Sequence, residues 1–251
     1  MDISVLVGLG LGFGGIILGN LLEGGHFSAL VQVTAGIIVF GGTFGATILA
    51  NSIEDFKLGL RLLKESIRKE DPSSYEKIVR AIVSSAQVAR SDSILALDEK
   101  VKSYPHPFMK KVFRFVVDGV DKETLVDVFE TEIDNTETQM LRGARVWEDA
   151  GGYAPTIGII GAVLGLIHVM ANLTDTSKLG QGIAVAFVAT IYGVGSANLI
   201  FLPIAQKIKG RVKQHRRVKE MILDGAESII GGFSPFIVEE KMRTYKTSSE
   251  I

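Results

Sequence analysis

Four long stretches of the chain are almost continuously apolar, and the polar residues are concentrated between and after them. The stretches are Ile3–Leu22, Ala29–Ala50, Gly152–Leu173 and Gly182–Ala205. Neither Lys, Arg, Asp nor Glu occurs between residues 24 and 53 or between residues 179 and 206. A hydrocarbon core about 30 Å thick is crossed by roughly 20 apolar residues in an α-helix. The pattern therefore predicts four transmembrane helices arranged as two hairpins.

The distribution of charge predicts four parts and a membrane orientation. The parts are a first hairpin at residues 1–50, a helical cytoplasmic domain at 51–150, a second hairpin at 151–206 and a basic cytoplasmic tail at 207–251. Sixteen of the 27 Lys and Arg residues lie in the second part and ten in the fourth. Because cytoplasmic segments carry the excess of Lys and Arg, we expect both termini on the cytoplasmic side of a bacterial inner membrane. The expected fold is an all-α integral membrane protein with a helical insert between spans two and three.

Helical periodicity fills the cytoplasmic insert. It predicts helices over Glu54–Lys69 and Ser73–Leu97, the second interrupted near Ser91. Asp121 is a candidate N-cap of a long helix that runs past Trp147 and continues into the third span. Acidic residues at the start of this helix and basic residues near its end suit the helix macrodipole.

Composition changes this picture mainly by exclusion. The chain has no Cys, and its four His residues are not spaced as metal ligands, so we predict no metal site. Nucleophile elbows, phosphate loops and paired catalytic carboxylates are not found either, so we predict neither an enzyme nor a cofactor. A net charge of −1 gives no argument for a nucleic-acid partner. The basic segment KIKGRVKQHRRVK after the fourth span is expected to face anionic lipid of the bilayer.

Small residues recur four positions apart in all four spans. Examples are Gly8 and Gly12 in the first span and Gly161 and Gly165 in the third. Such faces let helix backbones approach closely. Packing within one chain explains any single pair, but so many faces in four helices favour a homo-oligomer.

Few polar side chains lie at membrane depth, and none carries a fixed charge. Span three contains Thr156 and His168, and span four contains Thr190 together with a Tyr, a Ser and an Asn. A lone His in a span is more often hydrogen-bonded to a neighbouring helix than used as a proton relay, although ionisable residues at this depth are functional candidates. A Thr hydroxyl can bond the carbonyl one turn back.

Heptad spacing places further candidates on two stripes. Pro155 and Ala162 lie seven residues apart in span three, and Thr190 lies on a matching stripe of span four, with Pro203 near its cytoplasmic end. Prolines free backbone carbonyls that must be satisfied, usually where protein or water lines a cavity. The stripes predict an uncharged, narrowly hydrated wall. Because this wall has no carboxylate, a partner must provide the ion carrier.

These residues resemble those of a known family, the A subunits of the bacterial flagellar stator (MotA and PomA), within a wider group that includes ExbB and TolQ. The segments YAPTIGIIGAVLGLI (153–167) and ATIYGVGSANLIFLPIA (189–205) are similar to the third and fourth spans of the family. VARSDSILALDE (88–99) resembles a cytoplasmic motif that usually reads A-R-x-x-G-x-L-x-L-E. ExbB and TolQ have three spans, so the extra N-terminal hairpin favours the flagellar branch.

The resemblance implies a pentameric ring around two copies of a single-span MotB-like subunit, whose transmembrane Asp carries the ion. Thr190 and Thr156 would line the ion path, and Pro155 and Pro203 would shape the helices as the ring moves. Ala162 resembles the site where sodium-driven members have Thr. The transported ion implied is therefore H+ rather than Na+.

The cytoplasmic motif implies a contact with a switch-complex protein of the rotor. Arg90 matches the basic contact of the family, and Asp98 and Glu99 match its acidic contacts. Ser93 stands where Gly is usual and Asp98 where Glu is usual, which keeps the signs of charge but questions the local turn. An ExbB/TolQ-like energiser of another envelope process and a passive membrane scaffold remain the alternatives.

Overall fold

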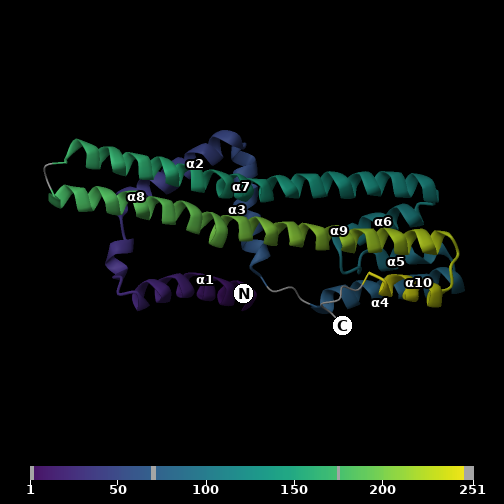
Figure 1. Ribbon diagram of the computed structural model, residues 1–251. Helices are drawn as coiled ribbons and strands as arrows, with labels where there is room; N and C mark the ends of the chain where they lie inside the picture. The colour runs from purple at the N-terminus through teal and green to yellow at the C-terminus, as the bar shows by residue number, and fades with distance from the viewer. Residues whose placement is uncertain (1–2, 69–71, 174–175, 246–251) are drawn as a thin grey trace. The chain divides into compact units, whose positions relative to one another are not determined.

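The computed structural model describes residues 3–68, 72–173 and 176–245 (Figure 1). Regular structure in these residues is entirely helical, as predicted. The α-helices are α1 (Ile3–Leu22), α2 (Val33–Ala50), α3 (Ile53–Ser66), α4 (Pro72–Ser91), α5 (Asp98–Val101), α6 (Pro107–Val117), α7 (Lys122–Ala171), α8 (Thr176–Ser196), α9 (Leu202–Ile230) and α10 (Pro235–Arg243). The others are two 3-10 helices, η1 (Phe27–Leu30) and η2 (Ile94–Leu97), and a π-helix, η3 (Ala197–Phe201).

Contacts divide the chain into two compact units that differ from the expected parts. Unit 1 contains residues 1–69 and 140–210, and unit 2 contains residues 70–139 and 211–251. Helices α7 and α9 contribute residues to both units. The described residues beyond 210, expected as a tail, are mostly helical and belong to unit 2.

Unit 1 holds α1, α2, α3 and α8, together with α7 from residue 140 and α9 up to residue 210. Four helical stretches in the described residues are long and apolar enough to cross a membrane, at Ile3–Leu22, Phe27–Ala50, Lys122–Ala171 and Leu179–Ile230. Helix α1 has the predicted bounds, whereas α2 begins at Val33 instead of Ala29. The hydroxyl of Tyr192 on α8 donates to the Leu30 carbonyl (2.7 Å) and accepts the Gln32 N–H (3.2 Å). This tertiary contact fixes the extended residue before α2, and hydropathy does not reveal it.

Glycines bring α7 and α8 into close contact within unit 1 (Figure 1). A Cβ added to Gly158 of α7 would lie 2.9 Å from the carbonyl oxygen of Ala189 on α8. One added to Gly165 would lie 2.8 Å from the carbonyl oxygen of Gly182. Glycine therefore permits a helix separation that larger residues would prevent.

The glycine face of α1 has few neighbours in the chain. No residue of α1 is buried, and a Cβ added to Gly8 or Gly15 would meet no atom within 4 Å. Gly12 is the exception, since its added Cβ would lie 3.0 Å from Leu199 of η3. The repeats in α7 and α8 thus serve packing within the chain, whereas most of α1 is left open.

A π-helical turn joins α8 to α9. The Leu202 N–H donates to the carbonyl of Ala197, five residues back. Pro203 follows directly, and it can neither donate to the Leu199 carbonyl nor tolerate that oxygen beside its ring. A wider turn before the proline accommodates both constraints, so η3 has an identifiable cause.

The described residues of unit 2 form a hydrophobic core, to which α4, η2, α5, α6, α7, α9 and α10 contribute. Its largest fully buried side chains are Ile78, Ile82, Leu97, Met109, Phe113, Leu125, Phe129, Met221, Ile222 and Met242. Helices α4 and α10 lie side by side (Figure 1), and the Tyr75 hydroxyl of α4 donates to the Met242 carbonyl at 2.8 Å. Described residues after 210, such as Met221 and Ile222, belong to this core because their apolar side chains recur at helical spacing and need a partner surface.

Two predicted boundaries are confirmed in unit 2. Helix α4 ends at Ser91, where the interruption was expected. Asp121 accepts the Thr124 N–H at 2.9 Å and so caps α7. The helix predicted over Glu54–Lys69 corresponds to α3, which ends at Ser66. Its predicted last residue, Lys69, lies outside the described residues.

Candidate functional site

The two threonines of the predicted wall each donate to a carbonyl of their own helix. Thr190 is half-buried, and its Oγ1 donates to the Ala186 carbonyl at 3.3 Å. Thr156 is exposed, and its Oγ1 donates to the Tyr153 carbonyl at 2.8 Å. A hydroxyl that donates in this way keeps both oxygen lone pairs. Each can therefore accept a hydrogen bond from water or another donor without losing its own bond.

The contact between α7 and α8 brings three candidates to one seam. A Cβ added to Gly158, one turn before Ala162, would lie 3.5 Å from the Cα of Thr190. Pro155 directly follows Ala154, whose carbonyl oxygen faces Gly193 of α8. Pro155 and Ala162 are both half-buried. We call this line of contact the α7–α8 seam, and it combines one hydroxyl with small or restricted residues.

The other two candidates of the membrane segments are exposed. Pro203 is the second residue of α9, directly after η3. His168 lies near the end of α7, where its carbonyl accepts from the Asn172 side chain at 2.9 Å. The hydrogen bond from the imidazole to a neighbouring helix, favoured by the sequence, is not formed among the described residues.

Carboxylates are absent from the helix segments that form the seam. Residues 150–171 and 179–196 contain neither Asp nor Glu. The preceding acidic residues of α7 are engaged elsewhere: Glu148 with Lys209, and Asp149 with the Asn51 side chain at 2.9 Å. The seam thus offers a hydroxyl and close packing, but no carboxylate.

The rotor-contact candidates lie at one corner of unit 2, residues 90–99, which we call the α4–α5 corner. Arg90 is near the end of α4, Asp98 and Glu99 begin α5, and all three are exposed. Ser93 has φ −176° and ψ 168°, an extended conformation open to any residue. The glycine usual at this position of the motif is therefore not required for the turn.

Comparison with known proteins identifies the family. The sequence profile of the MotA/TolQ/ExbB proton channel family matches residues 100–221, and that of the motility protein A N-terminal region matches residues 6–92. Motility protein A of Bacillus subtilis is 31% identical over 245 residues, which are 98% of this chain and 91% of the relative. The chain belongs to the motility protein A family.

Solved structures of the motility protein A family share the whole architecture. The flagellar MotAB stator complex from Bacillus subtilis contains a chain with 31% identity and a TM-score of 0.88, covering 98% of this chain and 96% of that one. A C. jejuni MotAB chain has 26% identity and a TM-score of 0.93, covering 100% and 99%. The similarity therefore includes both units.

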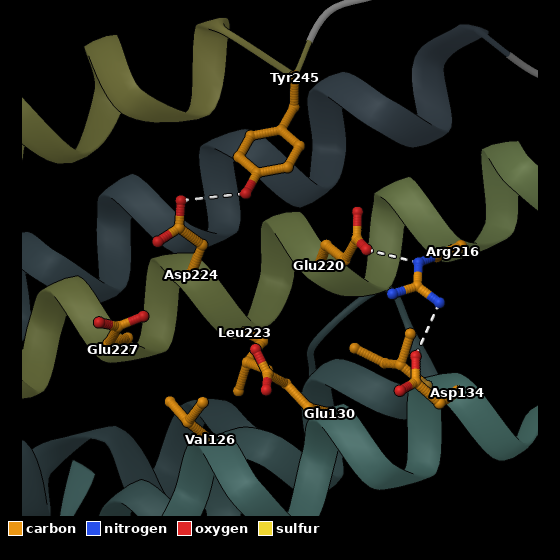
Figure 2. A pocket seen from close by; sticks show the side chains of 10 residues that line it. Val126, Glu130, Asp134, Arg216, Glu220, Leu223, Asp224, Glu227 and Tyr245 are labelled. Carbon is orange, nitrogen blue, oxygen red and sulfur yellow. Dashed lines mark hydrogen bonds and ion pairs between the residues drawn. The ribbon is translucent and has the colours of Figure 1, made fainter. Parts of the chain in front are cut away.

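Unit 2 also contains a cavity of about 350 Å³ between α7 and α9 (Figure 2). Its apolar lining residues are Val126, Ile133 and Leu223. The polar residues that line it are Glu130, Asp134, Arg216, Glu220, Asp224, Glu227 and Tyr245. Sequence analysis did not find this cavity. The spacing of Glu220, Asp224 and Glu227 on one face of α9 was the available signal, but acidic helix faces are usually just solvated.

The cavity carries surplus negative charge, although much of it is paired. Arg216 binds Asp134 at 2.7 Å, Glu220 at 2.6 Å, and also Glu137. Tyr245 donates to Asp224 at 3.1 Å, and burial together with the charge of Asp224 raises the pKa of Tyr245 to about 12. These contacts tie α7, α9 and Tyr245, the second residue after α10, together. Among the described residues no trio of His, Cys, Asp or Glu is arranged to hold a metal ion.

Proposed function

We propose that the chain is the A-type subunit of a flagellar stator and couples inward ion flow to torque on the rotor. The observation that carries the proposal is the α7–α8 seam, which has a hydroxyl and close-packed glycines but no carboxylate. A seam of this kind suits an ion path in which a second protein supplies the carboxylate. Membership of the motility protein A family supports the flagellar role.

The missing carboxylate would come from a single-span MotB-like partner with a transmembrane Asp. Five A chains form a ring around two such partners in the bacterial inner membrane, with both A-chain termini in the cytoplasm. The open glycine face of α1 supports contacts between neighbouring A chains. The similar solved structures are MotAB complexes, which supports a MotB-type partner.

Ion flow acts on the partner through a change of charge. Protonation neutralises the Asp and lowers the cost of placing it against the uncharged seam, whereas the ionised form requires hydrogen-bond donors or water. The preferred neighbour of the Asp in the ring therefore changes with each proton, and the ring steps. The membrane potential supplies about 2.3 kcal/mol per elementary charge per 100 mV.

The ion is H+ in this proposal. Thr190 supplies a hydroxyl to a hydrated proton path, with Thr156 as a second hydroxyl on α7. Ala162 presents a methyl group at the seam, and a methyl cannot replace a water ligand of Na+. Pro155 and Pro203 set the shape of the helices that move, and no resident cofactor takes part.

The α4–α5 corner contacts a switch-complex protein of the rotor in the cytoplasm. Arg90 meets an acidic group, and Asp98 and Glu99 meet basic groups. Exposed ion pairs contribute only about 0–1 kcal/mol each. Weak pairs suit a contact that must form and release at every step.

Native mass spectrometry of the chain co-expressed with its single-span partner tests this proposal. We expect five A chains with two partners, and loss of swimming when the gene is deleted in a strain with no second stator set. A partner without a peptidoglycan-binding domain would instead indicate an ExbB/TolQ-like energiser. A ring that recruits no carboxylate-bearing helix would contradict an ion-driven motor.

A further inference from the structure

The α4–α5 corner is held rigidly against α4. The Lys100 ammonium of α5 donates to the Ser84 hydroxyl at 2.8 Å. One turn away, the Ser85 and Tyr104 hydroxyls share a buried hydrogen bond of 2.7 Å. Leu97 of η2 is fully buried in the core of unit 2. The residues presented by this corner are therefore pre-organised, which lowers the entropy lost when a partner binds.

Leu95 is the apolar side chain that this corner holds in solvent. It lies two residues before Leu97, yet 70% of its surface is exposed. The Ala96 N–H donates to the Ser93 carbonyl at 3.2 Å and closes the 3-10 turn around it. A rigid turn that buries Leu97 cannot bury Leu95 at the same time. Its exposure is thus imposed by the backbone and does not reflect a free choice of rotamer.

The surroundings of Leu95 distinguish it from other exposed apolar residues, which are common on protein surfaces. Arg90 precedes it on the last turn of α4, and Asp98 and Glu99 follow it on α5. Specific interfaces combine an apolar centre with a polar rim. The corner also contains the exposed Asp92, so an exposed Leu with one basic and three acidic side chains around it in sequence reproduces this arrangement at the scale of ten residues.

We propose that Leu95 is the apolar anchor of the rotor contact. It enters an apolar hollow on the switch-complex protein, bordered by an acidic group opposite Arg90 and a basic group opposite Asp98 or Glu99. This inference rests on the proposed stator function. The ion pairs steer and orient the partner. Burial of the Leu95 side chain away from water then supplies the free energy that keeps the partner bound.

The experiment uses the full chain with its single-span partner in lipid nanodiscs. The probe is the purified switch-complex protein of the same organism, and the dissociation constant is measured by biolayer interferometry. We expect Leu95→Ala to weaken binding roughly ten-fold, mainly through a faster off-rate, since burial of a Leu is worth at least that factor. Leu95→Met should stay near wild type because it keeps the apolar volume.

Phe236→Ala is the matched control, since Phe236 of α10 is 71% exposed but lies outside the corner. It should bind like wild type, and native mass spectrometry should find the same ring for all variants. Equal loss in Leu95→Ala and Phe236→Ala, or no loss in either, overturns the anchor. A change in the ring instead of in rotor binding assigns Leu95 to a contact between copies and also overturns it. A wild-type complex that does not bind the probe overturns the rotor contact itself.

Discussion

Gly193 of α8 faces the carbonyl oxygen of Ala154 on α7 so closely that an added Cβ would lie 2.5 Å from that oxygen. The carbonyl is helix backbone and cannot move aside alone. The two helices would have to separate. Every residue of the α7–α8 seam would then shift with them.

Gly193→Ala should destabilise the protein by about 1–3 kcal/mol, the usual result of overpacking. The thermal unfolding midpoint of the detergent-solubilised chain, followed by the fluorescence of Trp147, measures the effect. Gly152→Ala is the control in α7, because a Cβ there would meet no atom within 4 Å. Equal midpoints for the two variants would show that the seam is not held by this contact.

Thr190→Val should abolish most ion flow while leaving the ring intact. Val has the same shape, and the Ala186 carbonyl already accepts a helix hydrogen bond, so loss of the hydroxyl does not unfold α8. An unpaired polar group in the ion path costs about 1–3 kcal/mol, so we expect roughly a ten-fold or greater loss of flux. Swimming speed and proton flux into inner-membrane vesicles report it.

Thr190→Ser serves as the comparison, because it retains the hydroxyl. It should keep most of the activity of the wild type. A passive scaffold predicts the opposite pattern, in which Thr190→Val swims normally and only packing variants such as Gly193→Ala fail.

Arg216→Lys should weaken unit 2 by about 1 kcal/mol. The guanidinium binds carboxylates of Asp134, Glu137 and Glu220, and these interactions raise its pKa further. An ammonium group cannot reproduce this forked geometry. The expected loss is modest because the Arg216 side chain is one-third exposed. The difference in unfolding midpoint between wild type and variant should shrink at high ionic strength.

Arg80→Lys provides the reference for that measurement. Arg80 forms an exposed pair with Glu76 within α4 and should show almost no change. A loss as large as that of Arg216→Lys would mean that the three-carboxylate arrangement has no special value.

His106 should make the start of α6 sensitive to mild acid. Its Nδ1 accepts the Phe108 N–H at 3.2 Å, which requires an unprotonated nitrogen. Burial, with the nearby Lys219 and His215, lowers the pKa of His106 below the usual 6.5. The unfolded chain therefore binds the proton first, and stability present above about pH 6.5 is lost as the pH falls toward the folded pKa.

Hydrogen exchange of the α6 amides, corrected for intrinsic rates, measures this loss. Protection should decrease between neutral and mildly acidic pH in the wild type. His106→Asn keeps a capping side chain without a titrating ring, so its protection should vary much less. Identical pH profiles would contradict a role for the imidazole.

The spans and the insert were readable from the sequence because hydropathy and helix caps are local properties. Helix α1 has its predicted bounds, and Asp121 caps α7 as expected. The start of α2 was missed because the Tyr192 hydroxyl, 162 residues from Leu30, decides it. The sequence did not show that residues beyond 210 complete a core, because the packing partners of apolar residues such as Met221 come from distant segments.

The sequence by itself determined where the chain is apolar, which segments are helical and which residues match the stator motifs. Only the tertiary structure decided which glycines are in close contact, that Leu95 is exposed while Leu97 is buried, and that Arg216 gathers three carboxylates. The physical reason is the separation along the chain over which each interaction acts. Hydropathy, capping and helical propensity act over a few residues, whereas exposure, close approach and charge pairing depend on which distant segments meet.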